Sequence, residues 1–309
     1  MTESIPIVSV VVLTHDRPEY LRLALDSIVR QSYKSLEVIV VDNLGDQSEE
    51  TAQVARSYSG VKLIQNRRNL GYTGGMNKGI AAASGKYIHF TVDDVVFDEH
   101  CIRSLVEHAE REPAAGLLSG ILYDEAGLII CAGGKFELAP IYVQTSFGAG
   151  EKDVGQFPQA FPVRYIPGGM IFTRTDFIKR LEGFRDDFFI YSEDSELCAR
   201  VSQLGREIVV VPQAKAVVHE VPHAFTPEGI AFHKLKNIFT LYLLHARLAV
   251  LPEFLLRYGI ISFPKYLLTN RGYVWPLLKA WAWFLFNAPF LITDRMRNRR
   301  LATTWPRSS

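Results

Sequence analysis

Short apolar runs alternate with helix-like stretches along the first 92 residues of the chain. The apolar, β-branched runs predict buried strands, and the stretches between them repeat apolar residues at helical spacing. The predicted strands are 8–13, 36–41, 61–64 and 87–92, and the predicted helices are 19–31, 48–58 and 74–83. This order is typical of an open, mostly parallel sheet with helices on both faces. We therefore expect an α/β fold.

Each predicted strand is followed by a polar cluster. The four clusters are Thr14-His15-Asp16, Asp42-Asn43, the segment 66–69 and Asp93-Asp94. Ligands of parallel α/β sheets bind at the carboxyl ends of the strands. We therefore expect four separate segments of the chain to converge on one crevice.

Asp93 and Asp94 place two adjacent carboxylates directly after a buried strand. Burying such a pair costs free energy unless a cation compensates, and a divalent ion held by carboxylate and phosphate oxygens is one interpretation. The other is a solvated turn in which one aspartate caps the next helix.

Two further motifs suit a nucleotide, each with a plainer alternative. Asp42 could accept hydrogen bonds from a nucleobase or ribose, or could only form a turn. In the segment 66–79, glycines at 71, 74, 75 and 79 allow close backbone approach to phosphate. A turn at the start of a helix explains the same glycines.

Beyond residue 119 the pattern loosens. Gly-rich, alternating segments over 119–165 suit hairpins and loops, helices are predicted at 175–180 and 192–204, and strands at 207–211 and 216–219. Glu193 and Asp194 open a predicted helix beside an aromatic run. Their only role could be a favourable interaction with the helix dipole, or one of them could act as a general base. His219, at a strand end, could bind metal or be structural.

Charge divides the chain near residue 233. Residues 1–232 contain 22 Lys and Arg against 31 Asp and Glu, a net charge of −9, whereas residues 233–309 contain 12 against 2, a net charge of +10. All four tryptophans lie in the basic part. An acidic body with a basic, aromatic tail is typical of an enzyme that meets an anionic surface.

Three cysteines without C-x-x-C spacing favour free thiols in a reducing compartment, and the amino terminus lacks the pattern of a signal peptide. We therefore expect a cytoplasmic protein. In the tail, the apolar stretches 233–251 and 274–293 are broken by Pro276, Lys279 and Pro289, which favours an element lying on the inner face of the cell membrane. The alternative is a helical appendage packed on the body or, in a homo-oligomer, on another copy.

Taken in order, the segments between about residues 8 and 220 resemble the family 2 glycosyltransferases of the GT-A fold, including rhamnosyltransferases. The matching segments are 11–21 (opening strand and helix), 38–43 (base-binding strand end), 69–79 (Gly-rich donor segment), 90–94 (D-x-D metal site), 168–170 (turn by the acceptor) and 193–194 (E-D catalytic base). The resemblance implies a catalytic domain over 1–225, with a nucleotide-sugar part at 1–118 and an acceptor and catalytic part at 119–225. The basic tail is 226–309.

The resemblance also implies a role for each matching residue. The donor side would comprise Thr14, Asp16, Asp42, Arg68, Asn69, Gly71, Asn77 and Asp93. The acceptor side would comprise Gly168, Gly169, Tyr191 and Arg200. A divalent metal, Mg²⁺ or Mn²⁺, would be held by Asp93 with Asp94 or His219. Asp194, beside Glu193, would be the base that deprotonates the acceptor in an inverting displacement.

The chain departs from the family pattern in two places, and it also lacks the Q-x-x-R-W sequence that the family's processive synthases carry. Thr91-Val92-Asp93-Asp94 lacks the first acid of D-x-D, and Asn43-Leu44-Gly45-Asp46 replaces the usual Asn-Gly-Ser. The absence of Q-x-x-R-W favours addition of a single sugar. The missing acid keeps a rival interpretation open, namely a non-catalytic sugar-nucleotide-binding or scaffold protein.

The implied partners are a UDP- or dTDP-sugar, with rhamnose favoured, and a glycan or lipid-linked acceptor in surface polysaccharide or glycolipid biosynthesis. We expect no nucleic-acid partner. Nucleotidyltransferases and dehydrogenases need a Gly-rich loop after the first strand, and the segment 14–18 offers none.

Overall fold

The computed structural model describes residues 5–138, 142–221, 226–257, 272 and 274–304. Its first part confirms the predicted alternation. In order, the elements are β1 (Val8–Thr14), α1 (Pro18–Val29), β2 (Leu36–Asp42), α2 (Ser48–Arg56), β3 (Lys62–Gln65), α3 (Gly71–Ala82) and β4 (Tyr87–Val92).

The middle of the chain completes the body. Its elements are β5 (Val95–Phe97), α4 (Cys101–Arg111), β6 (Ala115–Tyr123), β7 (Ile129–Cys131), β8 (Gly134–Leu138), β9 (Tyr142–Ser146), β10 (Phe161–Val163), β11 (Ile171–Arg174), α5 (Thr175–Arg180), η1 (Asp186–Phe188), α6 (Glu193–Gln203) and β12 (Glu207–Val218). The sequence did not predict β5, α4 and β11. The two strands predicted at 207–211 and 216–219 form one strand, β12, whose parallel pairing with β6 shifts register between Val210 and Lys215.

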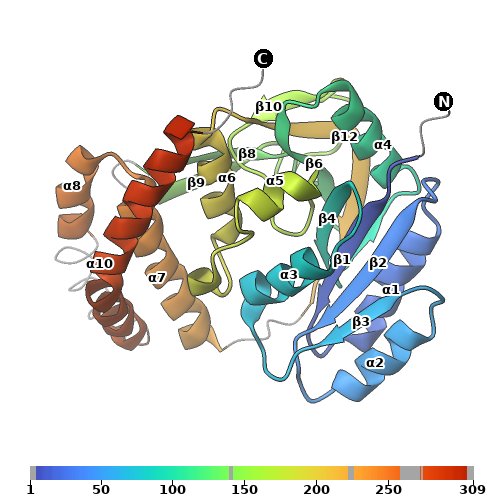
Figure 1. Ribbon diagram of the computed structural model, residues 1–309, viewed down its shortest axis with the longest axis horizontal. Coiled ribbons are helices and arrows are strands. Elements are labelled where there is room, and N and C mark those ends of the chain that lie inside the picture. Colours follow the sequence, from blue (N-terminus) through green and yellow to red (C-terminus); the bar gives the residue numbers. More distant parts are fainter. Residues whose placement is uncertain (1–4, 139–141, 222–225, 258–271, 273, 305–309) are drawn as a thin grey trace.

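The main sheet has the strand order β10-β12-β6-β11-β4-β1-β2-β3 (Figure 1). Strands β1 to β4 are parallel, as expected, and β11 enters antiparallel between β4 and β6. The carboxyl ends of β1, β2 and β4 therefore lie at one edge, which brings Thr14, Asp42 and Asp93 together.

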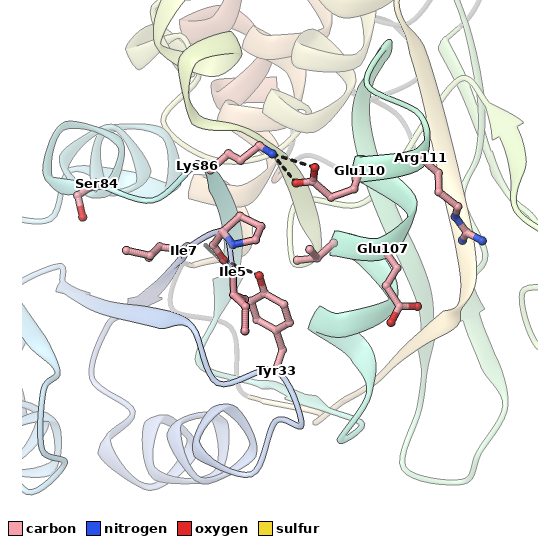
Figure 2. Close-up of a pocket in the computed structure, with 10 residues that line it drawn as sticks. Ile5, Ile7, Tyr33, Ser84, Lys86, Glu107, Glu110 and Arg111 are labelled. Carbon is pink, nitrogen blue, oxygen red and sulfur yellow. Dashed lines mark hydrogen bonds and ion pairs between the residues drawn. The ribbon is translucent and has the colours of Figure 1, made fainter. Parts of the chain in front are cut away.

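The opposite edge of the sheet has a larger hollow of about 1070 Å³ (Figure 2). It lies at the amino ends of β1, β2 and β4, where Lys86 pairs with Glu110 at 2.6 Å and the Tyr33 hydroxyl donates to the Pro6 carbonyl. None of the predicted site residues lines it. Its size alone does not make it the site, because ligands of such sheets bind at the carboxyl edge.

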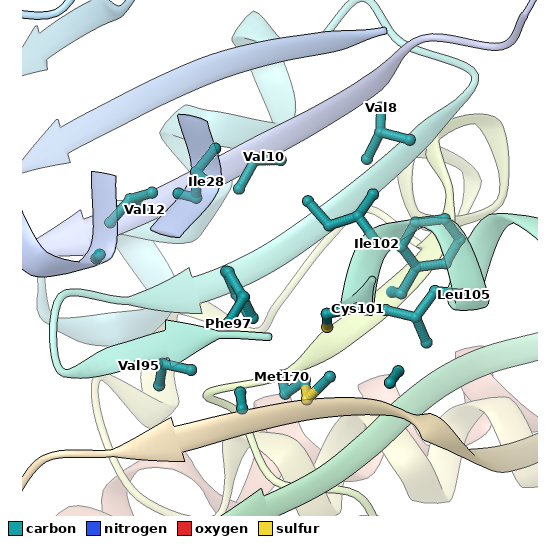
Figure 3. Packing of buried hydrophobic residues seen from close by; sticks show 14 of the residues in the cluster. Val8, Val10, Val12, Ile28, Val95, Phe97, Cys101, Ile102, Leu105 and Met170 are labelled. Carbon is teal, nitrogen blue, oxygen red and sulfur yellow. The ribbon is translucent and has the colours of Figure 1, made fainter. Parts of the chain in front are cut away.

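Each face of the sheet carries its own apolar core. Val8, Val10 and Val12 of β1 belong to the cluster that α1 and α4 cover, together with Ile28 and Ile102 (Figure 3). The alternate side chains of β1 belong to a second cluster, which α3, α5 and α6 cover. A strand buried on both faces explains why its sequence is a continuous apolar run.

The tail forms a third apolar cluster beside the body. Its elements are α7 (Pro227–His245), η2 (Leu248–Val250), α8 (Leu251–Leu255) and α10 (Val274–Thr304). Helices α7 and α10 pack along each other (Figure 1), and Arg185 of the body pairs with Asp294 of α10 at 2.9 Å. Within the described ranges, no helix has the length and apolarity needed to cross a membrane.

Candidate active site

A cavity of about 300 Å³ opens at the carboxyl edge of the sheet. Its walls come from the ends of β1, β2 and β4, the start of α3 and the loop before α6. Thr14, Asn43, Asn69, Asp93 and Tyr191 are among the lining residues. One residue from each of the four strand-end clusters thus lines one hollow, and we take this cavity as the candidate active site.

Asp93 and Asp94 share one arginine at the cavity. Asp93 Oδ2 accepts a hydrogen bond of 2.7 Å from the Thr14 hydroxyl, and the Arg17 guanidinium lies 3.4 Å from Asp93 Oδ1 and 3.7 Å from Asp94 Oδ2. Burial raises the pKa of Asp93 to about 6, although Arg17 and Thr14 oppose the rise. Asp94 Oδ1 is buried without a hydrogen-bond partner. The pair therefore retains capacity for a further cation.

The acidic pair could complete a metal site only with help from a ligand. The described residues contain no group of three or more His, Cys, Asp or Glu that could hold a metal ion. Two carboxylates nevertheless suit Mg²⁺ or Mn²⁺, which in phosphate-transferring sites take most other oxygens from substrate and water. The His219 ring lies against Glu125, with 2.6 Å between Nδ1 and Oε1, while the His219 amide donates to the Asp94 carbonyl.

Asp16 faces away from the acidic pair and fastens the loop after β2. Its carboxylate accepts hydrogen bonds from the amides of Asp46 and Gln47 at 3.0 and 2.7 Å. A Cβ on Gly45 would lie 2.1 Å from Asp16 Oδ1, so this loop needs glycine there. The segment 43–46, which replaces the family's Asn-Gly-Ser, is therefore held by contacts with Asp16, which follows β1.

Asp42 lies beneath the cavity, fully buried. Its Oδ2 accepts a weak hydrogen bond of 3.4 Å from Gln65, whereas Oδ1 has no partner. Burial raises the pKa of Asp42. An unpartnered buried carboxylate oxygen at a strand end is a polar group that a ligand could satisfy.

Gly71 brings the donor segment against the loop before α6. It has a φ of 69°, and a Cβ there would lie 2.4 Å from the Phe189 carbonyl oxygen. The Asn69 side chain accepts from the Gly71 amide at 2.7 Å, and Asn43 donates to the Gly71 carbonyl at 2.7 Å. Only glycine fits this contact, which sets one wall of the cavity.

Arg68 and Asn77 lie on the other side of Asn69, in a neighbouring hollow of about 660 Å³. The Asn77 amide group donates to the Phe184 carbonyl at 2.8 Å and to Asp186 at 2.7 Å. The structure therefore places Asn77 outside the 300 Å³ cavity, holding α3 to the segment before η1.

Glu193 and Asp194 begin helix α6. Asp194 is partly exposed; its Oδ2 accepts from the Tyr165 hydroxyl at 2.8 Å and the Gly168 amide at 3.3 Å, and its Oδ1 accepts from the Ser195 amide at 2.6 Å. Glu193 is only 7% exposed, and its Oε2 has no partner.

A single tyrosine links this acidic pair to the cavity. Tyr72 lines the cavity, and its hydroxyl donates to the Gly168 carbonyl at 2.6 Å. A Cβ on Gly168 would lie 3.3 Å from both Glu193 Oε1 and the Tyr72 hydroxyl oxygen, so the turn that contains Gly168 and Gly169 passes between them.

The two carboxyl groups differ in how readily they carry charge. Burial raises the pKa of both, and that of Glu193 well above its usual range. Hydrogen bonds from Tyr165, Ser195 and Gly168 stabilise the carboxylate of Asp194, whereas the Glu193 carboxyl group is opposed to ionisation by burial and by Asp194 and has one oxygen, Oε2, without a partner. These donors favour the charged form of Asp194 over that of Glu193, so Asp194 is the member of the pair that more readily carries the negative charge.

The loop that precedes this pair has an unusual backbone. Phe189, Tyr191 and Ser192 have φ values of 63°, 72° and 61°, a region that side-chain-bearing residues adopt infrequently. Such conformations persist only where the surroundings hold them. Tyr191 lines the cavity, so the loop joins its wall to the acidic pair.

Arg200 lies outside the cavity. Its guanidinium is buried, pairs with Glu196 at 2.8 Å and donates to the carbonyls of Leu181 and Gly183, both at 2.8 Å. These contacts hold α6 to the segment after α5. The structure thus gives Arg200 a supporting place rather than one on the cavity wall.

Sequence reasoning missed three residues of the site. Arg17 stands next to the first polar cluster, so its place at a strand end was a usable signal. Tyr72 and Tyr165 had none, because they meet Gly168 and Asp194 across 96 and 29 residues of sequence.

The chain is similar to known proteins in sequence and in fold. Residues 9–179 match the model of the family described as glycosyl transferase family 2. The amylovoran biosynthesis glycosyltransferase AmsB of Erwinia amylovora is 29% identical over 220 residues, covering 69% of each chain. The N-acetylglucosaminyl-diphospho-decaprenol L-rhamnosyltransferase of Mycobacterium tuberculosis is 25% identical over 264 residues, covering 77% of this chain and 84% of the relative.

Two solved structures share the fold. GalNAc-T7 with UDP, GalNAc and Mn²⁺ superposes with a TM-score of 0.63 at 16% identity, over 78% of this chain and 48% of the other. Staphylococcus aureus TarS superposes with a TM-score of 0.59 at 18% identity, over 96% of this chain and 54% of the other. The chain thus spans about half the length of each, and the likeness concerns the fold alone.

Proposed function

The chain belongs to glycosyltransferase family 2, and on that premise we propose that it moves a sugar from a UDP- or dTDP-sugar to a hydroxyl group of a glycan or lipid-linked acceptor, with inversion at the anomeric carbon. The observation that carries the proposal is the cavity at the carboxyl edge. Asp93, Asp94 and Tyr72 line it, and the Tyr72 hydroxyl donates to the carbonyl of Gly168, which lies beside Glu193.

The donor would lie along the strand ends. Asp42, with its unpartnered oxygen, and Arg68 or Asn69 would hold the nucleoside, and Thr14 and Gly71 would border the diphosphate. Asn77 and Asp16 would act indirectly, because their side chains hold in place the segments that carry the donor-binding residues.

Asp93 and Asp94 would hold a divalent ion together with diphosphate oxygens. The unpartnered oxygen of Asp94 and the single Arg17 shared by two carboxylates support this assignment. When bound, the ion would stabilise negative charge on the leaving diphosphate. His219 could join it only through Nε2, because its Nδ1 contacts Glu125.

Asp194 would take the proton of the acceptor hydroxyl. The acceptor oxygen forms the new bond to the anomeric carbon as the bond from that carbon to the diphosphate oxygen breaks, and the proton passes to Asp194. Glu193, whose pKa burial raises well above its usual range, would keep the neighbouring charge low. Gly168, Gly169 and Tyr191 would border the acceptor.

The relatives support the choice of sugar and acceptor. The mycobacterial relative is named for rhamnose and for a diphospho-decaprenol acceptor, and the Erwinia relative for amylovoran biosynthesis. We therefore infer a dTDP-deoxyhexose such as dTDP-rhamnose as donor, single addition, and a role in surface polysaccharide or glycolipid biosynthesis.

The thermal stability of the purified protein, measured with UDP, dTDP and their sugars, tests the donor side. A nucleotide that binds only the native state raises Tm. At a concentration of 100 times its Kd, it raises the apparent free energy of unfolding by about 3 kcal/mol. We expect one nucleotide class to raise Tm, and Mg²⁺ or Mn²⁺ to enlarge the rise. Asp93→Asn is the matched variant, and it should lose only the metal-dependent part. A panel without any rise would favour the non-catalytic interpretation.

The exposed face of α10 would rest on an anionic membrane at the inner face of the cell. Leu285, Phe286 and Phe290 are 65%, 78% and 67% exposed, although the opposite face of the same helix is buried on α7. Arg299 and Arg300 are exposed at its end, and Asp294, the one acid in this helix, is paired with Arg185. Apolar surface bordered by arginines suits anionic headgroups.

A further inference from the structure

We propose that Asn237 of tail helix α7 is a positioning residue for the acidic pair. The proposal rests on the proposed function, because it assigns to the tail the task of holding the loop 188–192 in the conformation from which Glu193 and Asp194 project.

The Asn237 side chain reaches three carbonyls of that loop. Asn237 is fully buried, and its Nδ2 lies 2.9 Å from the Phe188 oxygen, 2.8 Å from the Ile190 oxygen and 2.5 Å from the Tyr191 oxygen. A single amide group thus meets the backbone on both sides of Phe189 and next to Ser192. Phe189, Tyr191 and Ser192 have positive φ, so the amide bonds to or beside each residue whose backbone conformation most needs support.

Neighbouring residues of α7 reinforce the contact. The buried Lys236 ammonium donates to the carbonyls of Asp187 and Phe188. The His233 ring stacks on Phe189 with 4.9 Å between centroids, and Lys234 lies 5.0 Å from the centre of the Tyr191 ring. Residues 233–237, about one turn of α7, therefore contact the loop along most of its length.

The other side of the loop meets the donor segment. The Thr73 amide of α3 donates to the Phe189 carbonyl at 3.2 Å, and Gly71 lies against the same carbonyl. The loop is thus held between the donor segment and the tail, and helix α6 with Asp194 begins directly after it. Loss of the α7 contacts would move Asp194 relative to Tyr165 and Gly168 while leaving the strand-end residues in place.

Asn237→Asp tests this assignment, because it keeps the size of the side chain and replaces the donating group by an oxygen. We expect kcat to fall by about 30-fold or more, with the donor KM changed less than about threefold. Thr240→Val, one turn further along α7, is the matched control: it removes a buried hydroxyl that bonds only within the helix, to the Lys236 carbonyl. It should leave kcat within about twofold of the wild type.

Lys236→Met covers the case in which Asn237→Asp does not fold. Burial lowers the pKa of Lys236 to about 8, so an apolar side chain of similar length removes a buried charge and should fold. We expect kcat to fall by about tenfold with the donor KM retained. A folded Asn237→Asp or Lys236→Met protein with the kcat of the wild type would overturn the proposal. A wild-type protein that turns over no nucleotide sugar would instead overturn the proposed function.

Discussion

Replacing Asp194 by Asn is expected to lower kcat by about 10³-fold while the nucleotide-induced rise in Tm stays unchanged. The amide cannot take the acceptor proton, yet it keeps the size of the side chain and can still accept from Tyr165. Donor binding should survive because the strand-end residues lie on the other side of Tyr72. The comparison needs steady-state rates and thermal stability of the same preparation.

Glu193→Gln is the matched control. Burial raises the pKa of Glu193 well above its usual range, which favours the neutral acid, and glutamine resembles that acid in shape and charge. We expect this variant to keep at least about a tenth of the wild-type kcat. If Asp194→Asn and Glu193→Gln lower kcat equally, Asp194 alone is not the base. The two carboxyl groups then act as a unit, or Glu193 is the base.

The pH dependence follows from the same pair. Because burial raises the pKa of Asp194, kcat should fall with decreasing pH at a higher pH than an ordinary aspartate would give. The free energy of unfolding changes in the opposite direction to kcat. A carboxyl group whose pKa is raised in the folded state destabilises the folded protein as pH rises through the folded-state pKa. Glu193→Gln should therefore lose less stability than the wild type at alkaline pH. A kcat profile whose acidic limb is that of a free aspartate would contradict this account.

Replacing Phe286 and Phe290 by Ser should lower binding to anionic vesicles by at least about 100-fold, because each buried aromatic side chain contributes roughly 1.5–3 kcal/mol. Sedimentation with vesicles of phosphatidylglycerol and phosphatidylcholine measures the effect. Arg299→Glu with Arg300→Glu should weaken binding as well, and this contribution should vanish at high salt.

Val154→Ser is the control for the vesicle experiment, because Val154 is 82% exposed on the body, far from α10 in sequence. Vesicle binding should not change in this variant. The wild type could instead fail to bind vesicles and form dimers, while the double Phe variant is monomeric. In that case the exposed face of α10 is an interface between two copies, and the membrane proposal is wrong.

The order of elements in the body was predictable from local patterns. Strand β1 is buried on both faces and therefore appears as a continuous apolar run. Strand β11 was not predictable in this way. It is four residues long, and its place between β4 and β6 depends on pairing across more than 50 residues.

The candidate site was predictable only where a motif names a residue. Asp93 and Asp194 were predicted because they follow a strand and open a helix. Arg200 and Asn77 were assigned to ligands by resemblance, but their partners in the structure are mostly backbone carbonyls of 181–184. Asn237 had no signal, since its three carbonyl partners lie 46 to 49 residues earlier in the chain.

The most direct test of the central claim is the anomeric configuration of the product, followed by proton NMR. The reaction would contain the protein, Mg²⁺, a hydroxyl acceptor and the nucleotide sugar that raises Tm most. We expect release of the nucleoside diphosphate and a first product whose anomeric configuration is opposite to that of the donor, formed about 10³-fold more slowly by Asp194→Asn. Retention of configuration, or no release from any UDP- or dTDP-sugar, would contradict the assignment as an inverting glycosyltransferase.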